Sequence, residues 1–141
     1  MSILQELLKR VEAATGPDRE IDTAIWLQIA PGATRSQWSY IHKASARECF
    51  VDETRDATGR WITTPAYTGI LDAAVGLVEK MLPGWTGHLD FGGSQACGYV
   101  IRPLTEGPLL EHRAFGATPA LALCAALLRA LIASETQNEK R

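Results

Sequence analysis

The protein has 141 residues, of which 46% are hydrophobic and 21% charged, values typical of one ordinary globular domain that needs no metal or disulfide to fold. Its formal net charge of −2 at pH 7 argues against a dedicated nucleic-acid-binding protein, whose affinity depends on neutralising phosphates. Three widely spaced cysteines without a CxxC pair exclude a disulfide framework and a zinc motif, and favour reduced thiols.

Two short helices are predicted in the first 30 residues. Ser2 and Gln5 have the spacing of a capping box, and the apolar residues that follow recur at helical spacing. Thr15-Gly16-Pro17 ends this helix, because glycine can adopt the left-handed cap and proline cannot continue the helix. Asp18 can cap a second helix, which Ala30-Pro31-Gly32 ends.

From Thr34 to Thr64 the pattern changes to a period of two, which is typical of strands. Aromatic residues and His42 alternate with other side chains between Gln37 and His42. A second strand is predicted from Glu48 to Glu53 and a third from Trp61 to Thr64, with a turn between them at Asp56-Ala57-Thr58-Gly59. This stretch is therefore predicted to be a strand followed by a hairpin.

A third helix is predicted from Ile70 to Met81, with Thr68 as its cap and Pro83-Gly84 as its end. Three strands with turns between them follow: Trp85 to Phe91, Cys97 to Arg102 and Leu109 to Phe115.

Thr118-Pro119 is a strong start signal for the last helix, whose only charge from Ala120 to Ala133 is Arg129. A helix that is apolar nearly all round should be buried, so it is expected at the centre of the fold. Its longest apolar run, Pro119 to Leu128, is too short to span a bilayer. With no signal peptide expected at the start of the chain, a cytoplasmic protein is predicted.

Three segments together resemble the phage ABA sandwich family of small phage and prophage proteins. They are EAATGPDRE from Glu12, YTGILDAA from Tyr67 and ATPALALCAALLRA from Ala117. The resemblance implies a layered α/β/α sandwich, and it supplies no catalytic residues. We therefore expect an α+β fold with a mostly antiparallel sheet, helices on both faces and a buried C-terminal helix. Residues 1–141 should form a single domain, with a lineage-specific β elaboration at about 33–64.

Aromatic and basic residues are interleaved in and near this elaboration. They are Arg35, Trp38, Tyr40, His42, Lys43, Arg47, Arg60 and Trp61. A nucleotide base can stack on Trp or Tyr while arginine forks bind its phosphates, so these residues are the candidate ligand-binding site. Two other interpretations stay open: Trp38 and Tyr40 can pack onto the helices, or the stretch can form a surface for a partner protein.

Other chemistries have weaker signals. His88, Asp90, Glu111 and His112 have suitable side chains for a metal or acid–base site, or form the exposed polar face of a sheet. Ser94 lacks the GxSxG sequence of a nucleophilic serine, and Cys97 lies in a predicted strand with no catalytic base assigned to it. Gly92-Gly93-Ser94 can cradle a phosphate but is more typical of a plain turn. No catalytic residue, metal ligand or cofactor is assigned.

The function predicted from these features is non-catalytic binding by a phage-encoded protein in the host cytoplasm. The first hypothesis is a counter-defence protein that sequesters a nucleotide-derived host immune signal, as a homo-oligomer whose subunits enclose the ligand. One alternative is an inhibitor that binds a host protein directly, which predicts a large exposed apolar or aromatic patch and no enclosed basic pocket. Another is a small hydrolase or metal enzyme, which requires His88, Asp90 and His112 to converge in a cleft. A virion or packaging role is a further alternative.

Overall fold

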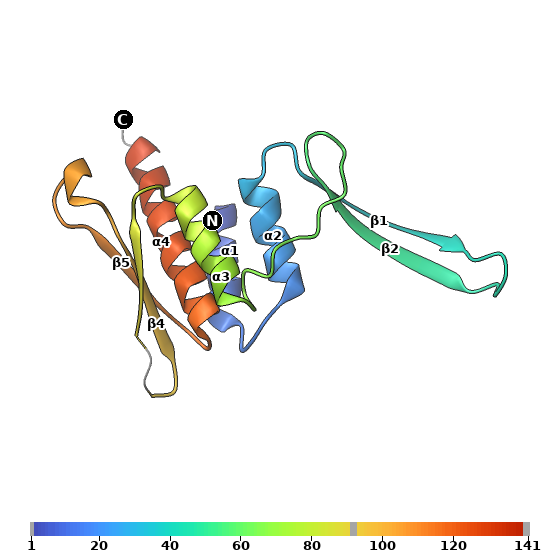
Figure 1. Ribbon diagram of the computed structural model, residues 1–141, viewed down its shortest axis with the longest axis horizontal. Helices are drawn as coiled ribbons and strands as arrows, with labels where there is room; N and C mark the ends of the chain where they lie inside the picture. Colours follow the sequence, from blue (N-terminus) through green and yellow to red (C-terminus); the bar gives the residue numbers. More distant parts are fainter. Residues whose placement is uncertain (1, 91–92, 140–141) are drawn as a thin grey trace. The chain divides into compact units, whose positions relative to one another are not determined.

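The computed structural model describes residues 2–90 and 93–139 of the chain (Figure 1). In chain order its elements are α1 (Ile3–Ala13), α2 (Arg19–Ile29), β1 (Thr34–Ile41), β2 (Glu48–Arg55), α3 (Leu71–Met81), β3 (Thr86–Asp90), β4 (Ala96–Ile101), the short 3-10 helix η1 (Leu104–Glu106), β5 (Glu111–Gly116) and α4 (Pro119–Glu139). The chain was expected to be one domain with an elaboration at about 33–64. The structure divides into two compact units, of which Thr23–Pro65 is one and the remainder of the chain is the other.

The larger unit contains an antiparallel sheet of strand order β3-β4-β5, and α4 packs directly against it. Two glycines make this close approach possible. A Cβ at Gly98 would lie 2.8 Å from the carbonyl oxygen of Ala122, and one at Gly116 would lie 2.5 Å from its backbone nitrogen. The absence of these side chains therefore sets the distance between helix and sheet.

Helix α4 forms the centre of this unit, as predicted. Every residue from Ala120 to Leu128 is buried, and so is Ala130. Helices α1 and α3 pack on the other side of α4, so α4 lies between them and the sheet (Figure 1). The helix is longer than its apolar run. Its length and composition would allow it to cross a membrane, but 56% of its most apolar 18-residue segment is buried inside the protein. Its apolar surface therefore serves the core of an α+β domain.

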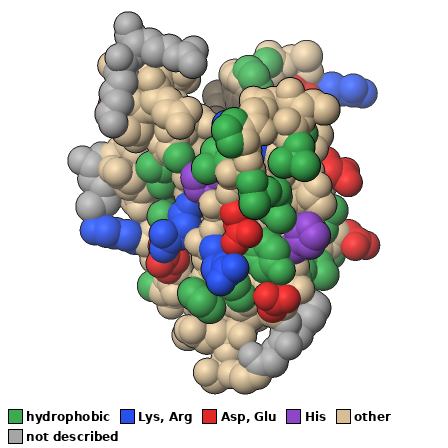
Figure 2. Space-filling view, turned by 90° about the vertical axis from the view of Figure 1, so that its left-hand side faces the viewer, with side chains coloured by type: hydrophobic (Ala, Val, Ile, Leu, Met, Phe, Trp, Pro, Cys, Tyr) green, Lys and Arg blue, Asp and Glu red, His purple; other side chains and the backbone are tan. Residues whose placement is uncertain are grey.

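The α+β class, the antiparallel sheet and the buried C-terminal helix are confirmed. Helices were expected on both faces of the sheet, but in the described residues the packing of helices is on one face, that of Gly98 and Val100. The strand register places His88, Tyr99 and Arg113 on the opposite face, which we call the outer face. Figure 2 shows the molecule from the side of this sheet, with hydrophobic, acidic, basic and histidine side chains interspersed.

The predicted helix caps are confirmed at three positions. Ser2 and Gln5 form the reciprocal capping box of α1, and Asp18 Oδ1 accepts from the backbone N–H groups of Glu20 and Ile21 at the start of α2. Thr118 Oγ1 accepts from the backbone of Leu121 in α4.

The prediction that Thr68 caps α3 is wrong. Helix α3 begins after Ile70, which provides no side-chain cap. The Thr68 hydroxyl instead donates to Asp22 Oδ1 (2.7 Å) and accepts from the backbone N–H of Asp18 (2.8 Å). Thr68 has no exposed surface, and in a buried site the Asp22 carboxylate is the stronger partner for its hydroxyl.

The three segments of the phage-family resemblance meet around this buried contact. The Asp22 carboxylate also accepts from the backbone N–H of Thr68 (2.8 Å), and the Cys124 thiol donates to the carbonyl of Tyr67 (3.4 Å). Burial, and next the nearby Asp22 carboxylate, raises the pKa of Cys124 to about 12. The segments therefore have a structural role, because they join α2, α4 and the chain before α3.

The second unit contains a hairpin that differs from the predicted one. Strand β2 pairs with β1 over its full length, from Thr34–Arg55 to Ile41–Glu48. The predicted strand from Trp61 to Thr64 is reduced to one bridge between Arg55 and Trp61. The Asp56 turn does form, but pairing stops after Ile62 N–H donates to Thr54, and Pro65 has no N–H to extend a ladder. Of the predicted strand Trp85 to Phe91 and the turn Gly92-Gly93-Ser94, Phe91 and Gly92 lie outside the described residues.

Candidate functional site

The candidate ligand-binding residues lie on or beside the hairpin formed by residues 34–55, called the hairpin below. Its register pairs Trp38 with Val51, Tyr40 with Cys49 and Ser39 with Phe50. Because side chains alternate along a strand, Trp38 and Tyr40 share one face of the hairpin, and Phe50 lies on the other.

Large apolar side chains are exposed on both faces of the hairpin. Trp38 and Tyr40 are 48% and 45% exposed, and their ring centroids are 5.8 Å apart at a tilt of 41°. On the other face Ile41 is 62% exposed and Phe50 is 80% exposed. Trp38 and Tyr40 are therefore about half open to solvent in the hairpin, and the interpretation in which they pack onto the helices stays a prediction.

Arg35 is engaged with a carboxylate of the hairpin. Its Nε donates to Asp52 Oδ1 (2.9 Å) and its Nη2 to Asp52 Oδ2 (2.6 Å), which is a two-pronged ion pair. These hydrogen bonds from Arg35 lower the pKa of Asp52. A phosphate would have to displace the carboxylate in order to use the same donors.

Three predicted site residues, His42, Lys43 and Arg47, lie in the turn between β1 and β2, called the tip below. The backbone N–H of His42 donates to the carbonyl of Arg47 (2.9 Å), and His42 Nδ1 lies 3.3 Å from the hydroxyl of Ser45. All six residues from 42 to 47 are exposed, and none is acidic. The tip is therefore basic and open to solvent.

Arg60 and Trp61 lie at the opposite end of the hairpin. Trp61 is 68% exposed, and the Arg55 guanidinium lies over its ring, 5.4 Å from the centroid. Arg47 precedes β2 and Arg55 ends it, so the two lie about 25 Å apart along a strand that rises about 3.3 Å per residue. The structure therefore places the eight predicted residues at two ends and on two faces of the hairpin, and it does not bring them into one pocket. Their role in binding a ligand stays a prediction.

Sequence reasoning missed Phe50 and Ile41 as candidate site residues. Phe50 was taken only as part of a strand, and Ile41 as one of the residues that separate Trp38, Tyr40 and His42. The register of β1 with β2 was needed to show that Ile41 and Phe50 share a face. It places Phe50 opposite Ser39, and Ser39 lies on the same face of β1 as Ile41.

The residues required by the hydrolase alternative do not converge. His88 is paired with Tyr99 on the outer face of the sheet, and their rings stack at 5.3 Å with an 8° angle. His112 is opposite Val100, on the face that α4 covers. Residues 2–90 and 93–139 contain no group of three potential metal ligands. The specific His88, Asp90 and His112 site is therefore not formed.

The remaining candidate groups have structural partners. Glu111 forms an ion pair with Arg113 (3.0 Å), whose guanidinium also lies 5.5 Å from the Tyr99 ring centroid. Gly93 has a φ of 82°, which fits the turn interpretation of its segment. Cys97 is opposite Asp90 and Phe115 on the outer face and is half-buried.

Searches of protein-family models, of curated proteins and of solved structures find no match to this chain.

Proposed function

We propose that this chain is a non-catalytic protein-binding protein and that the hairpin is the part that docks on its partner. The observation that supports this most is the exposure of Trp38 and Tyr40 on one face and of Ile41 and Phe50 on the other. A two-stranded hairpin with both faces in water has marginal stability of its own. Burying one large apolar side chain contributes about 1.5–3 kcal/mol, so a partner that covers both faces would stabilise the hairpin.

The chemistry of the hairpin indicates the kind of partner surface. Trp, Tyr and Arg are the residue types that dominate binding hot spots. An apolar groove would accept the aromatic side chains, and carboxylates near its end would complement Lys43 and Arg47 at the tip. The resemblance to phage proteins makes a host protein the expected partner. The three cysteines of the described chain are free, which supports a cytoplasmic location for this encounter.

Site-specific photo-crosslinking in cells tests the proposal. A photoreactive phenylalanine analogue would replace Phe50 in the hairpin, and in a matched control it would replace Leu104, which is 73% exposed in the larger unit. We expect one protein to be crosslinked from position 50 and not from position 104. With that protein purified, Trp38→Ala and Phe50→Ala should each weaken binding by about 2 kcal/mol, or about 30-fold in Kd.

The proposal fails if position 50 yields the same products as position 104. It also fails if the purified partner binds the Trp38→Ala and Phe50→Ala variants as tightly as it binds the unmodified chain. Circular dichroism spectra of the variants would show that the helices of the larger unit are intact in each comparison.

Sequestration of a nucleotide-derived signal is the second candidate function. The observation in its favour is the exposed Trp38–Tyr40 pair on the same strand that leads to the basic tip. Because both faces of the hairpin are open, a second copy of the chain would have to close the site, so this function requires a homo-oligomer.

Native mass spectrometry of protein purified from cells that produce cyclic nucleotide signals distinguishes the two functions. A stoichiometric mass increment on an oligomer would support sequestration. A monomer of unmodified mass would contradict it.

A further inference from the structure

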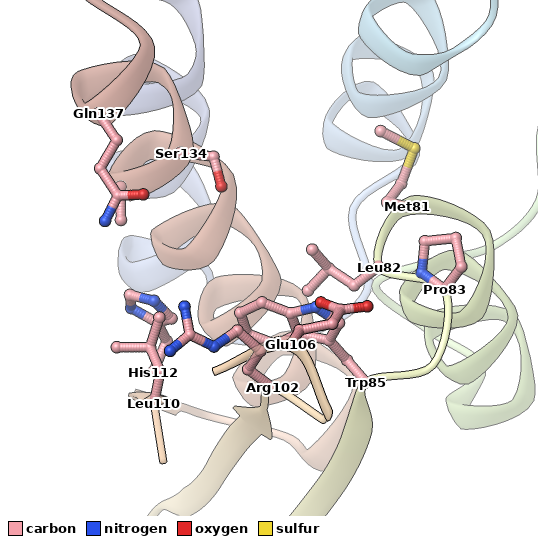
Figure 3. A pocket seen from close by; sticks show the side chains of 11 residues that line it. Met81, Leu82, Pro83, Trp85, Arg102, Glu106, Leu110, His112, Ser134 and Gln137 are labelled. Carbon is pink, nitrogen blue, oxygen red and sulfur yellow. The ribbon is translucent and has the colours of Figure 1, made fainter. Parts of the chain in front are cut away.

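A cavity of about 450 Å³ lies in the larger unit, and none of its lining residues belongs to the hairpin. It is bounded by the last turns of α4, the end of α3 and the adjacent ends of the sheet strands (Figure 3). Ser134 and Gln137 project from α4 at one side, and Arg102, His112 and Trp85 lie together at the floor (Figure 3). This volume is in the range of sites that bind small organic molecules.

The floor of the cavity contains a hydrogen-bond donor without an acceptor. Arg102 Nη2 donates to the carbonyl of Pro108 (2.7 Å), which fixes the guanidinium under the loop after η1. Arg102 Nε is buried and has no hydrogen-bond partner in the described residues. Buried hydrogen-bond donors in folded proteins nearly always have an acceptor, and a positively charged donor binds an anionic acceptor most strongly. Nε itself has no accessible surface, so an anion in the cavity would be held by the Nη groups and the positive charge of the guanidinium.

Flat rings and apolar groups lie beside this donor. Trp85 and His112 are stacked at 6.2 Å with an angle of 21°, and Leu82 and Leu110 line the same cavity. Burial, and next the positive charge of Arg129, lowers the pKa of His112, which keeps the imidazole neutral at neutral pH. A neutral imidazole and the Gln137 amide can each donate and accept hydrogen bonds, so they suit the polar edge of a small molecule.

The cavity contains charges of both signs. Arg102 and Glu106 are its charged lining residues, and Arg129 lines a neighbouring cavity that shares His112. A ligand with one compact anionic group at Arg102 and an uncharged body elsewhere is compatible with Glu106. A polyanion is less suitable, since a second anionic group would approach that carboxylate.

We propose that this cavity binds a small planar monoanion, whose carboxylate accepts from the Nη groups of the Arg102 guanidinium while its aromatic body lies against Trp85 and His112. The site is independent of the hairpin. Protein binding by the hairpin and ligand binding by this cavity can therefore fail or succeed separately.

Nuclear magnetic resonance with 15N-labelled protein tests the proposal, because it observes the Nε–H of Arg102 and the indole N–H of Trp85 directly. The probe is naphthalene-2-carboxylate, and the matched neutral compound is naphthalene-2-carboxamide. We expect the carboxylate to shift both resonances in a saturable titration, and the amide to bind at least about tenfold more weakly, the loss expected for one charge-assisted hydrogen bond.

Variants separate a specific site from general attraction of anions. Arg102→Gln should weaken carboxylate binding by at least about tenfold, and Arg113→Gln, on the outer face of the sheet, should leave it unchanged. Arg102→Lys provides a second test if Arg102→Gln does not fold, because it keeps the charge but has no planar guanidinium donor at the same place. Equal binding of acid and amide, equal binding by the Arg102 and Arg113 variants, or the absence of a saturable shift at Arg102 would each overturn the proposal.

Discussion

Asp22 is 1% exposed, and both of its carboxylate oxygens accept hydrogen bonds. Oδ1 accepts from the backbone N–H and the hydroxyl of Thr68, and Oδ2 accepts from Arg19 Nη1 (2.9 Å). A buried carboxylate is tolerated only when donors replace the water that it loses. The Asp22–Thr68 contact therefore stabilises the larger unit, because each side chain supplies the hydrogen-bond partner that the other needs in a buried site.

Replacing Thr68 with Val tests this contact at nearly constant volume. The change removes the hydroxyl from Asp22 and the acceptor from the backbone N–H of Asp18, so we expect a loss of about 2–3 kcal/mol in the free energy of unfolding. Urea denaturation measures it. Thr86→Val, at an exposed position of β3, is the control and should change stability by less than about 0.5 kcal/mol. A Thr68→Val loss as small as that of the control would show that the contact contributes little.

His112 makes the stability of the fold depend on pH. Its pKa is below the ordinary value of 6.5 in the folded protein because of burial and Arg129. As pH falls from 6.5, the unfolded chain takes up a proton at this residue before the folded protein does, so stability is lost as pH falls through the folded pKa and is fully present above pH 6.5.

The His112→Gln variant isolates this contribution. We expect the unmodified protein to lose more unfolding free energy between pH 7 and pH 5 than the variant does, with urea denaturation as the measurement. The two proteins differ only at residue 112, so the comparison reports on that side chain alone. The same pH dependence in both proteins would show that His112 does not contribute.

At the scale of elements, α4 and the sheet are held together by backbone-to-backbone contact at glycines. A Cβ at Gly98 would come within 2.7 Å of the Ala122 carbonyl carbon, and backbone atoms cannot move away as a flexible side chain can. In contrast, a Cβ at Gly76 in α3 would meet nothing within 4 Å. The two glycines therefore have opposite consequences when they are replaced.

Gly98→Ala should destabilise the protein by about 1–3 kcal/mol or more, because α4 must shift away from β4. Gly76→Ala should stabilise it by about 0.5–1 kcal/mol, since alanine favours the helical backbone and has room. Thermal and urea unfolding of the two variants measure both effects. Equal stabilities for Gly98→Ala and the unmodified chain would show that α4 can adjust without cost.

At the scale of the whole molecule, the two units should differ in local stability. Every residue of α4 from Ala120 to Leu128 is buried, whereas every residue of β1 and β2 is exposed or half-buried. Local opening costs little free energy where few apolar groups become exposed by it.

Amide hydrogen exchange tests this difference. We expect the amides of β1 and β2 to exchange much faster than those of α4, although both sets are hydrogen-bonded in regular structure. Addition of a protein partner should slow exchange in the hairpin, if the hairpin binds it as proposed. Hairpin amides as protected as those of α4 in the isolated protein would contradict the expected difference.

The sequence by itself determined the features that depend on neighbouring residues. The capping residues Ser2, Asp18 and Thr118 act within one helical turn, so local spacing identified them. The burial of α4 followed from its lack of charge, and the α+β class followed from the two periodicities. The alternation around Trp38 and Tyr40 likewise predicted a strand with both rings on one side.

Only the tertiary structure decided which distant groups meet. Thr68 looks like a helix cap in the sequence, but its hydroxyl donates a hydrogen bond to Asp22, which is 46 residues away. Strand β2 pairs with β1 and not with the segment after Asp56, and the close approach at Gly98 depends on where α4 lies. The physical reason is that periodicity fixes the direction of a side chain relative to its own backbone. What covers that side chain, or leaves it in water as at Trp38 and Phe50, depends on packing between segments that the local pattern does not encode.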